Sequence, residues 1–266
     1  MDATNTVIDP MFGPAEADRL AAYHLVRLAA GTLATVRVPG FLPAEVCRDV
    51  AAVLDSVPMD ICDPRRVNPP IARLGPVLND HRRDGALNAS YWPQVDLARQ
   101  TWRDTGLAPD PLRLCLDAFG VAWGGDIVSA TIGGRAAFAG TIREINGGAH
   151  VHYDEVVREF PDGLFDQAVV AQLAFNAYLS VPASGGQTTI WRRCWQPADE
   201  TARLGYGYRP EVVAGVQSVT VTPATGDGLI FNPRHYHAVA PSVAGRRITL
   251  GFFLAITATG QLIVWS

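Results

Sequence analysis

Four of the six histidines in the chain form two pairs in which one residue separates the partners, His150 with His152 and His235 with His237. Alternate residues of a β-strand project from the same face, so each pair is expected on one side of an extended segment. Asp154 follows His152 with the same spacing and adds a carboxylate to that side. Two imidazoles and one carboxylate are typical of non-haem Fe(II) sites that keep three positions open, although zinc also accepts such ligands. The sequence therefore predicts a metal site in which His152 and Asp154 are joined by a histidine of the remote second pair.

The elements expected to position these residues change in character near Gly125. Upstream of it, Ala- and Leu-rich stretches predict helices. These helices span residues 15–30, 41–56, 93–106 and 110–121, with a strand at 34–40 before the second of them. Residues 59–90 are rich in Pro and Arg and have no clear period, which predicts a long loop of the kind that often covers a functional site.

From residue 125 onwards, β-branched and aromatic residues occur in short runs separated by Gly, Pro and Asp. Many short strands at regular spacing are typical of a sandwich or barrel. We therefore expect a mostly β fold in which a helical N-terminal layer packs on an antiparallel sandwich. No linker separates the two halves, so residues 1–266 are expected to form one domain, mainly helical at 1–124 and with its β core at 125–266.

The composition excludes several classes of protein. A net charge of -4 and a pI near 5.8 argue against a nucleic-acid partner, which requires a basic face. No run of about 18 apolar residues occurs, so no membrane span is expected, and the N-terminus lacks the features of a secretory signal. The four cysteines are widely spaced without a CxxC pair, which favours free thiols in a reducing cytoplasm over a zinc site or disulfide scaffold.

Five segments follow one another in an order that is more specific than any one of them. They are VRVPGFLPAEVCRDV at 36–50, HYD at 152–154, YLSVPASGG at 178–186, GDGLIFNPRHYHAVAP at 226–241 and GRRIT at 245–249. Together they resemble the Fe(II)/2-oxoglutarate-dependent oxygenase superfamily, which carries His-x-Asp, a distant His and an Arg beyond it. The likeness covers roughly residues 140–256 and implies a double-stranded β-helix core, also described as jelly-roll or cupin-like.

The resemblance also implies which residues bind the metal. His-x-Asp fits only His152 with Asp154, and the family run His-x-Val-x-Pro fits His237. His150 and His235 then fall beside the site, where they are expected to support a ligand or to contact substrate.

The cosubstrate of this family, 2-oxoglutarate, is a dicarboxylate whose far carboxylate is buried and needs a bidentate partner. The chain has no lysine, so arginine supplies all 22 basic side chains. Arg247 is the expected partner, ten residues after the distal histidine, with Thr249 as a helper hydroxyl on the same strand face. Arg246 is the alternative, because a shift of one residue exchanges the two faces. Tyr178 matches a position whose phenol contacts the cosubstrate in prolyl-hydroxylase relatives, although packing in a strand explains this aromatic equally well.

In outline, the resemblance implies an enzyme that uses Fe(II), 2-oxoglutarate and O2, releases succinate and CO2, and oxidises an unactivated C–H bond of a small molecule. Related iron halogenases carry Gly or Ala in place of the metal-binding carboxylate, so Asp154 favours hydroxylation, desaturation or ring formation over halogenation. Chain length and the stretch FNAYLSVP resemble a small bacterial branch that acts on amino-acid derivatives and other secondary metabolites. The arginine-rich stretch 63–74 and residues 81–83 either cover the site and bind an anion or form a solvated loop.

Two other interpretations remain open at this point. A cupin-type metalloenzyme also carries His-x-His on a similar barrel, but Glu155 and Glu159 are both misplaced for the cupin glutamate, and such an enzyme works without 2-oxoglutarate. A non-catalytic barrel that binds a small molecule has no need of an intact ligand triad and a following arginine.

Overall fold

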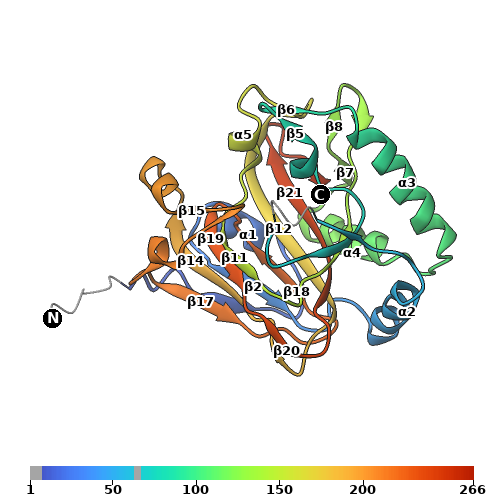
Figure 1. The fold of residues 1–266 in the computed structure, drawn as a ribbon, viewed down its shortest axis with the longest axis horizontal. Helices are drawn as coiled ribbons and strands as arrows, with labels where there is room; N and C mark the ends of the chain where they lie inside the picture. The colour runs from blue at the N-terminus through green and yellow to red at the C-terminus, as the bar shows by residue number, and fades with distance from the viewer. Residues whose placement is uncertain (1–7, 63–66) are drawn as a thin grey trace.

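Two β-sheets and a layer of helices make up the fold, as Figure 1 shows for this computed structural model. The structure describes residues 8–62 and 67–266. Long strands of the larger sheet run through the middle of the view, the smaller sheet lies to their left, and helices cover the right-hand side. No helix in these residues is long and apolar enough to cross a membrane.

The larger sheet contains ten strands. They are β1 (Pro14–Glu16), β2 (Thr35–Val38), β3 (Asp60–Ile61), β4 (Ala72–Leu74), β7 (Ile127–Ser129), β10 (Thr141–Glu144), β12 (Val169–Ser180), β18 (Gly228–Phe231), β21 (Ile248–Thr257) and β22 (Leu262–Trp265). Their hydrogen-bonded order is β1-β2-β18-β12-β21-β10-β4-β3, with β22 beside β21 and β7 beside β22. The long antiparallel pair β12 and β21 forms the centre of the sheet.

The smaller sheet contains six strands in the order β15-β16-β11-β19-β14-β17. Their bounds are β11 (Ala149–His152), β14 (Thr188–Cys194), β15 (Arg203–Leu204), β16 (Gly207–Tyr208), β17 (Ser218–Val221) and β19 (His235–Val239). Three two-stranded ribbons complete the β structure: β5 (Arg82–Arg83) with β6 (Ala86–Leu87), β8 (Thr131–Ile132) with β9 (Arg135–Ala136), and β13 (Ser184–Gly185) with β20 (Ser242–Ala244).

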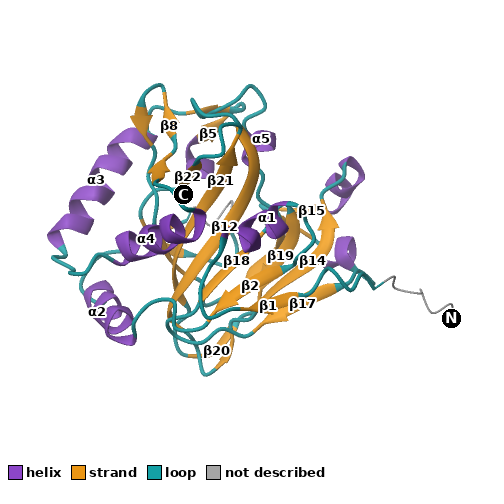
Figure 2. Cartoon of the chain, turned by 180° about the vertical axis from the view of Figure 1, so that it is seen from behind, coloured by secondary structure: helices purple, strands orange, loops and turns teal. Residues whose placement is uncertain are grey.

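The α-helices are α1 (Ala22–Ala29), α2 (Ala44–Leu54), α3 (Tyr91–Asp104), α4 (Pro111–Trp123) and α5 (Val156–Glu159). Short 3-10 helices occur at η1 (Leu78–His81), η2 (Pro197–Ala202) and η3 (Pro210–Val213). Seen from behind in Figure 2, α2, α3 and α4 lie on the side of the larger sheet that faces away from the smaller one. The ends of α4 follow from local chemistry, because Asp110 accepts a hydrogen bond from the Leu112 N–H and Gly124 adopts a left-handed φ of 80°.

The period of two along the central strands separates an apolar face from a cavity-facing one. Phe175 of β12 and Phe252 of β21 point toward the helices, where the ring of Phe119 on α4 lies 5.1 and 5.7 Å from theirs between centroids. These side chains belong to the main hydrophobic core, whose burial holds the helices on the sheet. Asn176 and Tyr178 alternate with the apolar residues of β12 and therefore lie on the opposite face.

The expected mostly β fold with a helical layer is confirmed, although the two sheets do not close into a barrel. The helices predicted at 93–106 and 110–121 are present as α3 and α4, and Pro43 directly precedes α2.

Two details of the prediction were wrong. The helix expected at 15–30 begins only at Ala22, because Pro14–Glu16 forms a strand that pairs in parallel with β2. The N-terminal third is also less purely helical than expected: β2 pairs with β18 and β4 pairs with β10, so the larger sheet draws strands from both sides of residue 124. Short strands such as these gain their stability from cross-strand partners, which no local pattern reveals.

Candidate metal and cosubstrate site

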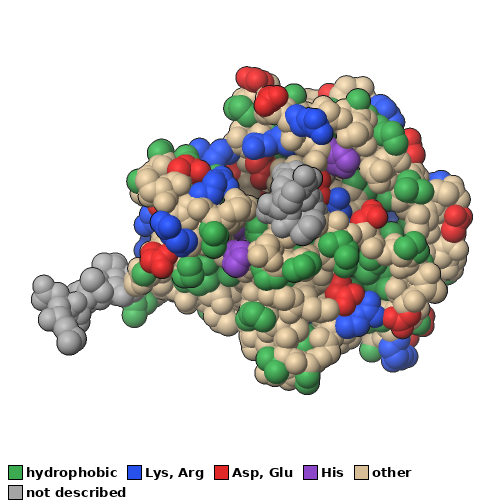
Figure 3. All heavy atoms as spheres, viewed as in Figure 1, with side chains coloured by type: hydrophobic (Ala, Val, Ile, Leu, Met, Phe, Trp, Pro, Cys, Tyr) green, Lys and Arg blue, Asp and Glu red, His purple; other side chains and the backbone are tan. Residues whose placement is uncertain are grey.

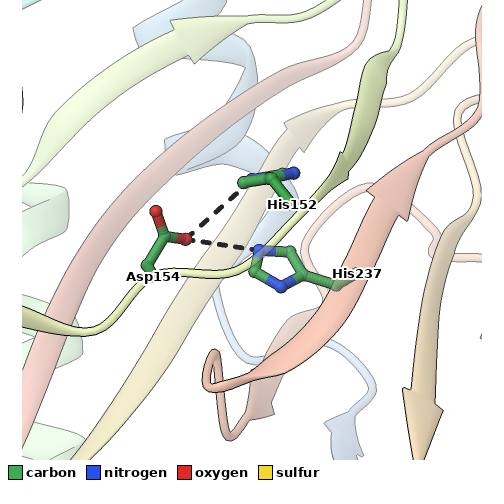
Figure 4. Close-up of side chains that lie close together, drawn as sticks. All are labelled: His152, Asp154 and His237. Carbon is green, nitrogen blue, oxygen red and sulfur yellow. Dashed lines mark ion pairs between the residues drawn. The ribbon is translucent and has the colours of Figure 1, made fainter. Parts of the chain in front are cut away.

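His152, Asp154 and His237 converge where the smaller sheet meets the segment that follows β11. His152 ends β11 and lies opposite His237 in the antiparallel pairing with β19. Asp154 lies beyond the strand, contrary to the expectation of a shared strand face, and its backbone N–H donates to Pro233 O at 2.9 Å. The ligand atoms of the three residues lie within 4.8 Å of one another. Figure 4 shows the two imidazoles and the carboxylate facing a common point.

Backbone carbonyls determine which ring nitrogen of each histidine faces that point. The Nδ1 atom of His152 lies 2.7 Å from His150 O, and that of His237 lies 2.9 Å from His235 O. We assign the proton to Nδ1 in both rings, which leaves Nε2 deprotonated and able to bind a metal. The two Nε2 atoms lie 3.9 and 3.3 Å from Asp154 Oδ2. This donor set of two imidazole nitrogens and one carboxylate oxygen fits Fe(II).

The electrostatics of the triad favour the protonation states that bind a cation. Burial, followed by the neighbouring His237, lowers the pKa of His152 to about 4. Burial acts to raise the pKa of Asp154, but the adjacent His237, followed by His152 and Arg143, outweighs it, so this pKa lies below its ordinary value. At neutral pH the site therefore presents a neutral imidazole at His152 and an ionised carboxylate at Asp154.

Arg247 lies in the same cavity, a space of about 740 Å³ lined by both sheets. It is 2% exposed. Its Nε donates to Gly186 O at 3.0 Å, and Nη2 donates to Thr188 Oγ1 at 3.2 Å and to Tyr178 Oη at 3.4 Å. Gly186 has a φ of 73°, and a Cβ there would lie 3.3 Å from Arg247 Cδ, so a glycine suits this close approach. All of these partners are neutral, which leaves the guanidinium charge available to a carboxylate ligand.

The neighbouring arginine has a different environment. Arg246 forms ion pairs of 2.6 Å with Asp55 and 2.7 Å with Glu144, away from the triad, and its side chain is 37% exposed. Thr249, in contrast, is fully buried, and within the described part of the chain its Oγ1 has no hydrogen-bond partner. Arg246 and Arg247 directly precede β21, and their side chains point to opposite sides: Arg247 enters the cavity, and Arg246 turns toward Glu144 and Asp55.

The expected substrate contacts of His150 and His235 are not supported, because neither ring is among the described residues that line the cavity. His150 packs against Tyr206, whose hydroxyl accepts a hydrogen bond from the His150 N–H at 2.7 Å. The ring of His235 stacks edge-on against Phe12, and its Nδ1 lies 3.8 Å from Cys194 Sγ. Their carbonyl oxygens, rather than their rings, act on the site by orienting the metal-facing histidines.

The predicted loop at 59–90 does contribute to the cavity. Arg73 on β4 lines it and pairs with Asp80, and Arg82 donates to Glu159 O at 2.8 Å. Part of the arginine-rich stretch expected to bind an anion, residues 63–66, lies outside the described residues. In Figure 3 basic side chains gather around β15 and α5, where Arg203 lines the cavity and is paired with a carboxylate.

The sequence alone did not predict several residues that line the cavity: Arg143, Asn176, Thr188, Glu159 and Tyr206. Burial, followed by the charge of Asp154, raises the pKa of Glu159 to about 7. Arg143 lies in the half of the chain where short strands are expected, but which face of its strand meets the cavity depends on pairing with β21 and β4. Thr188 and Asn176 carried no signal beyond being polar residues in otherwise apolar strands.

Comparison with known proteins agrees with this geometry. A family model described as the carrier-protein-independent halogenase WelO5 matches residues 134–266. The L-gamma-glutamyl-L-propargylglycine hydroxylase of Streptantibioticus cattleyicolor is 51% identical over 258 residues, which cover 96% of this chain and 96% of that protein. Among solved structures, an N-substituted L-amino acid dioxygenase from Burkholderia ambifaria, in complex with alpha-KG, matches with a TM-score of 0.58 and 14% identity over 92% of this chain and 91% of that chain. A 2OG-Fe(II) oxygenase family oxidoreductase from Burkholderia pseudomallei matches with a TM-score of 0.50 and 16% identity over 92% and 95% of the two chains.

The chain belongs to the Fe(II)/2-oxoglutarate-dependent oxygenases. The two structural matches show the corresponding jelly-roll fold. The prediction of an Fe(II)- and 2-oxoglutarate-dependent enzyme is thereby confirmed in family, fold and cofactors, and the cupin and non-catalytic interpretations are set aside.

Proposed function

We propose that this oxygenase hydroxylates a C–H bond of a small amino-acid derivative, of the γ-glutamyl amino-acid type named for its 51% identical relative. In this proposal His152, Asp154 and His237 bind Fe(II), and Arg247 binds the far carboxylate of 2-oxoglutarate. The observation that carries it is the convergence of three ligand atoms within 4.8 Å in a cavity that also contains a buried arginine with neutral partners only.

The chain's own residues have three tasks in the reaction. The carbonyls of His150 and His235 keep the ligating imidazoles in one orientation. Thr188 and Tyr178 support the guanidinium of Arg247, with Thr249 offering a further hydroxyl nearby. Apolar side chains of the cavity wall exclude water from the reacting carbon. When bound, Fe(II) and 2-oxoglutarate supply the oxidising power for an unactivated C–H bond, using O2.

The metal-binding carboxylate decides between hydroxylation and halogenation. The matching family model is named for a halogenase, and related iron halogenases carry Gly or Ala where this chain has Asp154. Asp154 Oδ2 lies 3.3 Å from His237 Nε2, so this carboxylate would bind the iron at the position that a halide would need. Hydroxylation is therefore the outcome we propose.

We also propose a cytoplasmic location. The four free thiols support it, because such thiols persist in a reducing compartment.

The proposal is tested with L-γ-glutamyl-L-propargylglycine as substrate. Purified protein receives Fe(II), 2-oxoglutarate and air, and succinate and the mass of the product are measured with and without chloride. We expect succinate and a product heavier by one oxygen atom in equal amounts in both buffers. A chlorinated product, or succinate without any modified dipeptide, would contradict the proposal.

A further inference from the structure

Arg143 is a further cation that lines the cavity and, within the described residues, has no counter-ion. It lies on β10, in register with Thr249 of β21 on one side and Arg73 of β4 on the other. Its side chain lines the cavity, and within the described residues it forms no hydrogen bond or ion pair. Burial, opposed by the charge of Asp154, leaves the pKa of the guanidinium below its ordinary value. The surroundings therefore disfavour this charge, and a ligand of opposite charge would relieve the cost.

The other charges of the cavity do not supply that partner. Arg73 pairs with Asp80, and Arg203 pairs with Glu200 at 2.8 Å. Glu159 accepts a hydrogen bond from Asn79 Nδ2 at 2.9 Å and, within the described residues, forms no ion pair with Arg143. In the loaded enzyme, the charges of Fe(II) and Arg247 are balanced by those of Asp154 and the dianion 2-oxoglutarate. The positive charge of Arg143 is then left over, beside the metal.

The amide of Asn176 lies beside Arg143 in the cavity. Both side chains approach Gly251 on β21 closely, because a Cβ there would lie 2.9 Å from Asn176 Oδ1 and 3.0 Å from Arg143 Nη1. Asn176 also lines the cavity, and the nitrogen and oxygen of its amide exchange places on rotation. A guanidinium and an amide that meet over one glycine offer charge-assisted and neutral hydrogen bonds to one carboxylate in the cavity.

We propose that Arg143, assisted by Asn176, binds a carboxylate of the substrate, namely the one on the amino-acid unit that is oxidised. The position of Arg143 indicates which unit this is. Arg143 pairs with Thr249 across two strands and is close enough to Asp154 for their charges to interact. A carboxylate bound to Arg143 would therefore place the carbons next to it near the metal site. This inference rests on the proposed function for the kind of substrate, but it specifies a group and a residue that the proposed function leaves open.

The test compares a free acid with its amide. L-γ-Glutamyl-L-propargylglycine and the variant amidated at the propargylglycine carboxyl are titrated into the anaerobic Fe(II)/2-oxoglutarate complex by calorimetry. Arg143→Gln should weaken binding of the acid on the order of 100-fold and binding of the amide less than about threefold. The affinity of Arg143→Lys for the acid should lie between that of wild type and that of Arg143→Gln. Gly251→Ala should weaken binding of the acid more than binding of the amide, because its methyl group would displace Asn176 and Arg143.

Two further readouts separate substrate binding from other roles. The dissociation constant of 2-oxoglutarate should stay within about threefold of wild type in Arg143→Gln, because the cosubstrate is assigned to Arg247. The melting temperature of the Mn(II)- and 2-oxoglutarate-loaded Arg143→Gln protein should equal or exceed that of wild type, because an uncompensated buried charge is removed. Arg113→Gln, an exposed change on α4, serves as the control for loss of an arginine.

Three results would overturn the inference: equal weakening of acid and amide, a large rise in the 2-oxoglutarate dissociation constant, or a marked fall in melting temperature. If wild type binds neither dipeptide, the γ-glutamyl part of the proposed function fails instead. The same acid–amide comparison with N-acetyl amino acids then decides the role of Arg143, and equal affinity of wild type for both members of every pair refutes it.

Discussion

Replacing Arg247 by Gln tests which of two adjacent arginines, Arg246 or Arg247, binds 2-oxoglutarate. Arg247 is 2% exposed, and its hydrogen bonds run to Gly186 O, Thr188 and Tyr178, all without charge. The matched control is Arg246→Gln, which removes a partly exposed side chain paired with Glu144 and Asp55.

The expected sizes of the two effects differ widely. Removing one partner of a buried charge pair costs about 2–5 kcal/mol, so Arg247→Gln should raise the dissociation constant of 2-oxoglutarate by roughly 30- to 4000-fold. Surface ion pairs contribute about 0.2–1 kcal/mol, so Arg246→Gln should lower stability slightly and change that constant less than about threefold. Arg247→Lys should recover part of the loss, because it keeps the charge but not the fork of donors.

The assay is an anaerobic titration of the Fe(II) protein with 2-oxoglutarate, followed by the visible charge-transfer band of the chelate. Fe(II) affinity is measured separately by equilibrium dialysis, so that a lost metal is not mistaken for a lost cosubstrate. A larger effect in Arg246→Gln than in Arg247→Gln, or a normal titration of Arg247→Gln, would refute the assignment.

Three further changes test the metal site, the cavity electrostatics and the core. Asp154→Ala should lower Fe(II) affinity at least about tenfold and abolish coupled succinate formation in chloride-free buffer, and intact turnover would contradict its role as ligand. The pKa of Glu159 is raised from 4.5 to about 7 in the folded metal-free protein. The contribution of this group to stability is therefore complete below pH 4.5 and is lost as the pH rises to about 7. Glu159→Gln should therefore gain stability relative to wild type between pH 5 and 7.5, by up to roughly 3 kcal/mol in urea unfolding, and a constant difference across that range would argue against the raised pKa. Phe119→Ala should lower the free energy of unfolding by about 3–5 kcal/mol while leaving 2-oxoglutarate binding by the folded fraction unchanged; a smaller loss would mean that the core closes around the gap.

The sequence predicted the proximity of His152 and Asp154 for a local reason. His152 and Asp154 are separated by one residue, and backbone geometry keeps such neighbours close whether or not both lie in a strand. The prediction was right about their proximity even though Asp154 lies beyond the end of β11. The repeated spacing of the histidines had a second meaning that the sequence did not show: it places the carbonyls of His150 and His235 against the ligand rings.

The sequence alone did not predict which residues are brought together by the pairing of distant strands. The choice between Arg246 and Arg247 required the register of β21, which directly follows them, because a shift of one residue exchanges the side chain that faces the cavity. The close approach of Arg143 and Asn176 to Gly251 required the pairing of β21 with both β10 and β12.

The sequence by itself thus determined the class of enzyme, the mostly β fold and the ligand types, because these depend on composition, on strand period and on motifs within a few residues. Only the tertiary structure decided which arginine enters the cavity, that β2 and β4 join the larger sheet, and that Arg143 has no counter-ion among the described residues. Those properties depend on contacts between residues far apart in the chain, as between Arg143 and Thr249 or between Val36 and Ile230, and on how much water each charge loses when the sheets pack.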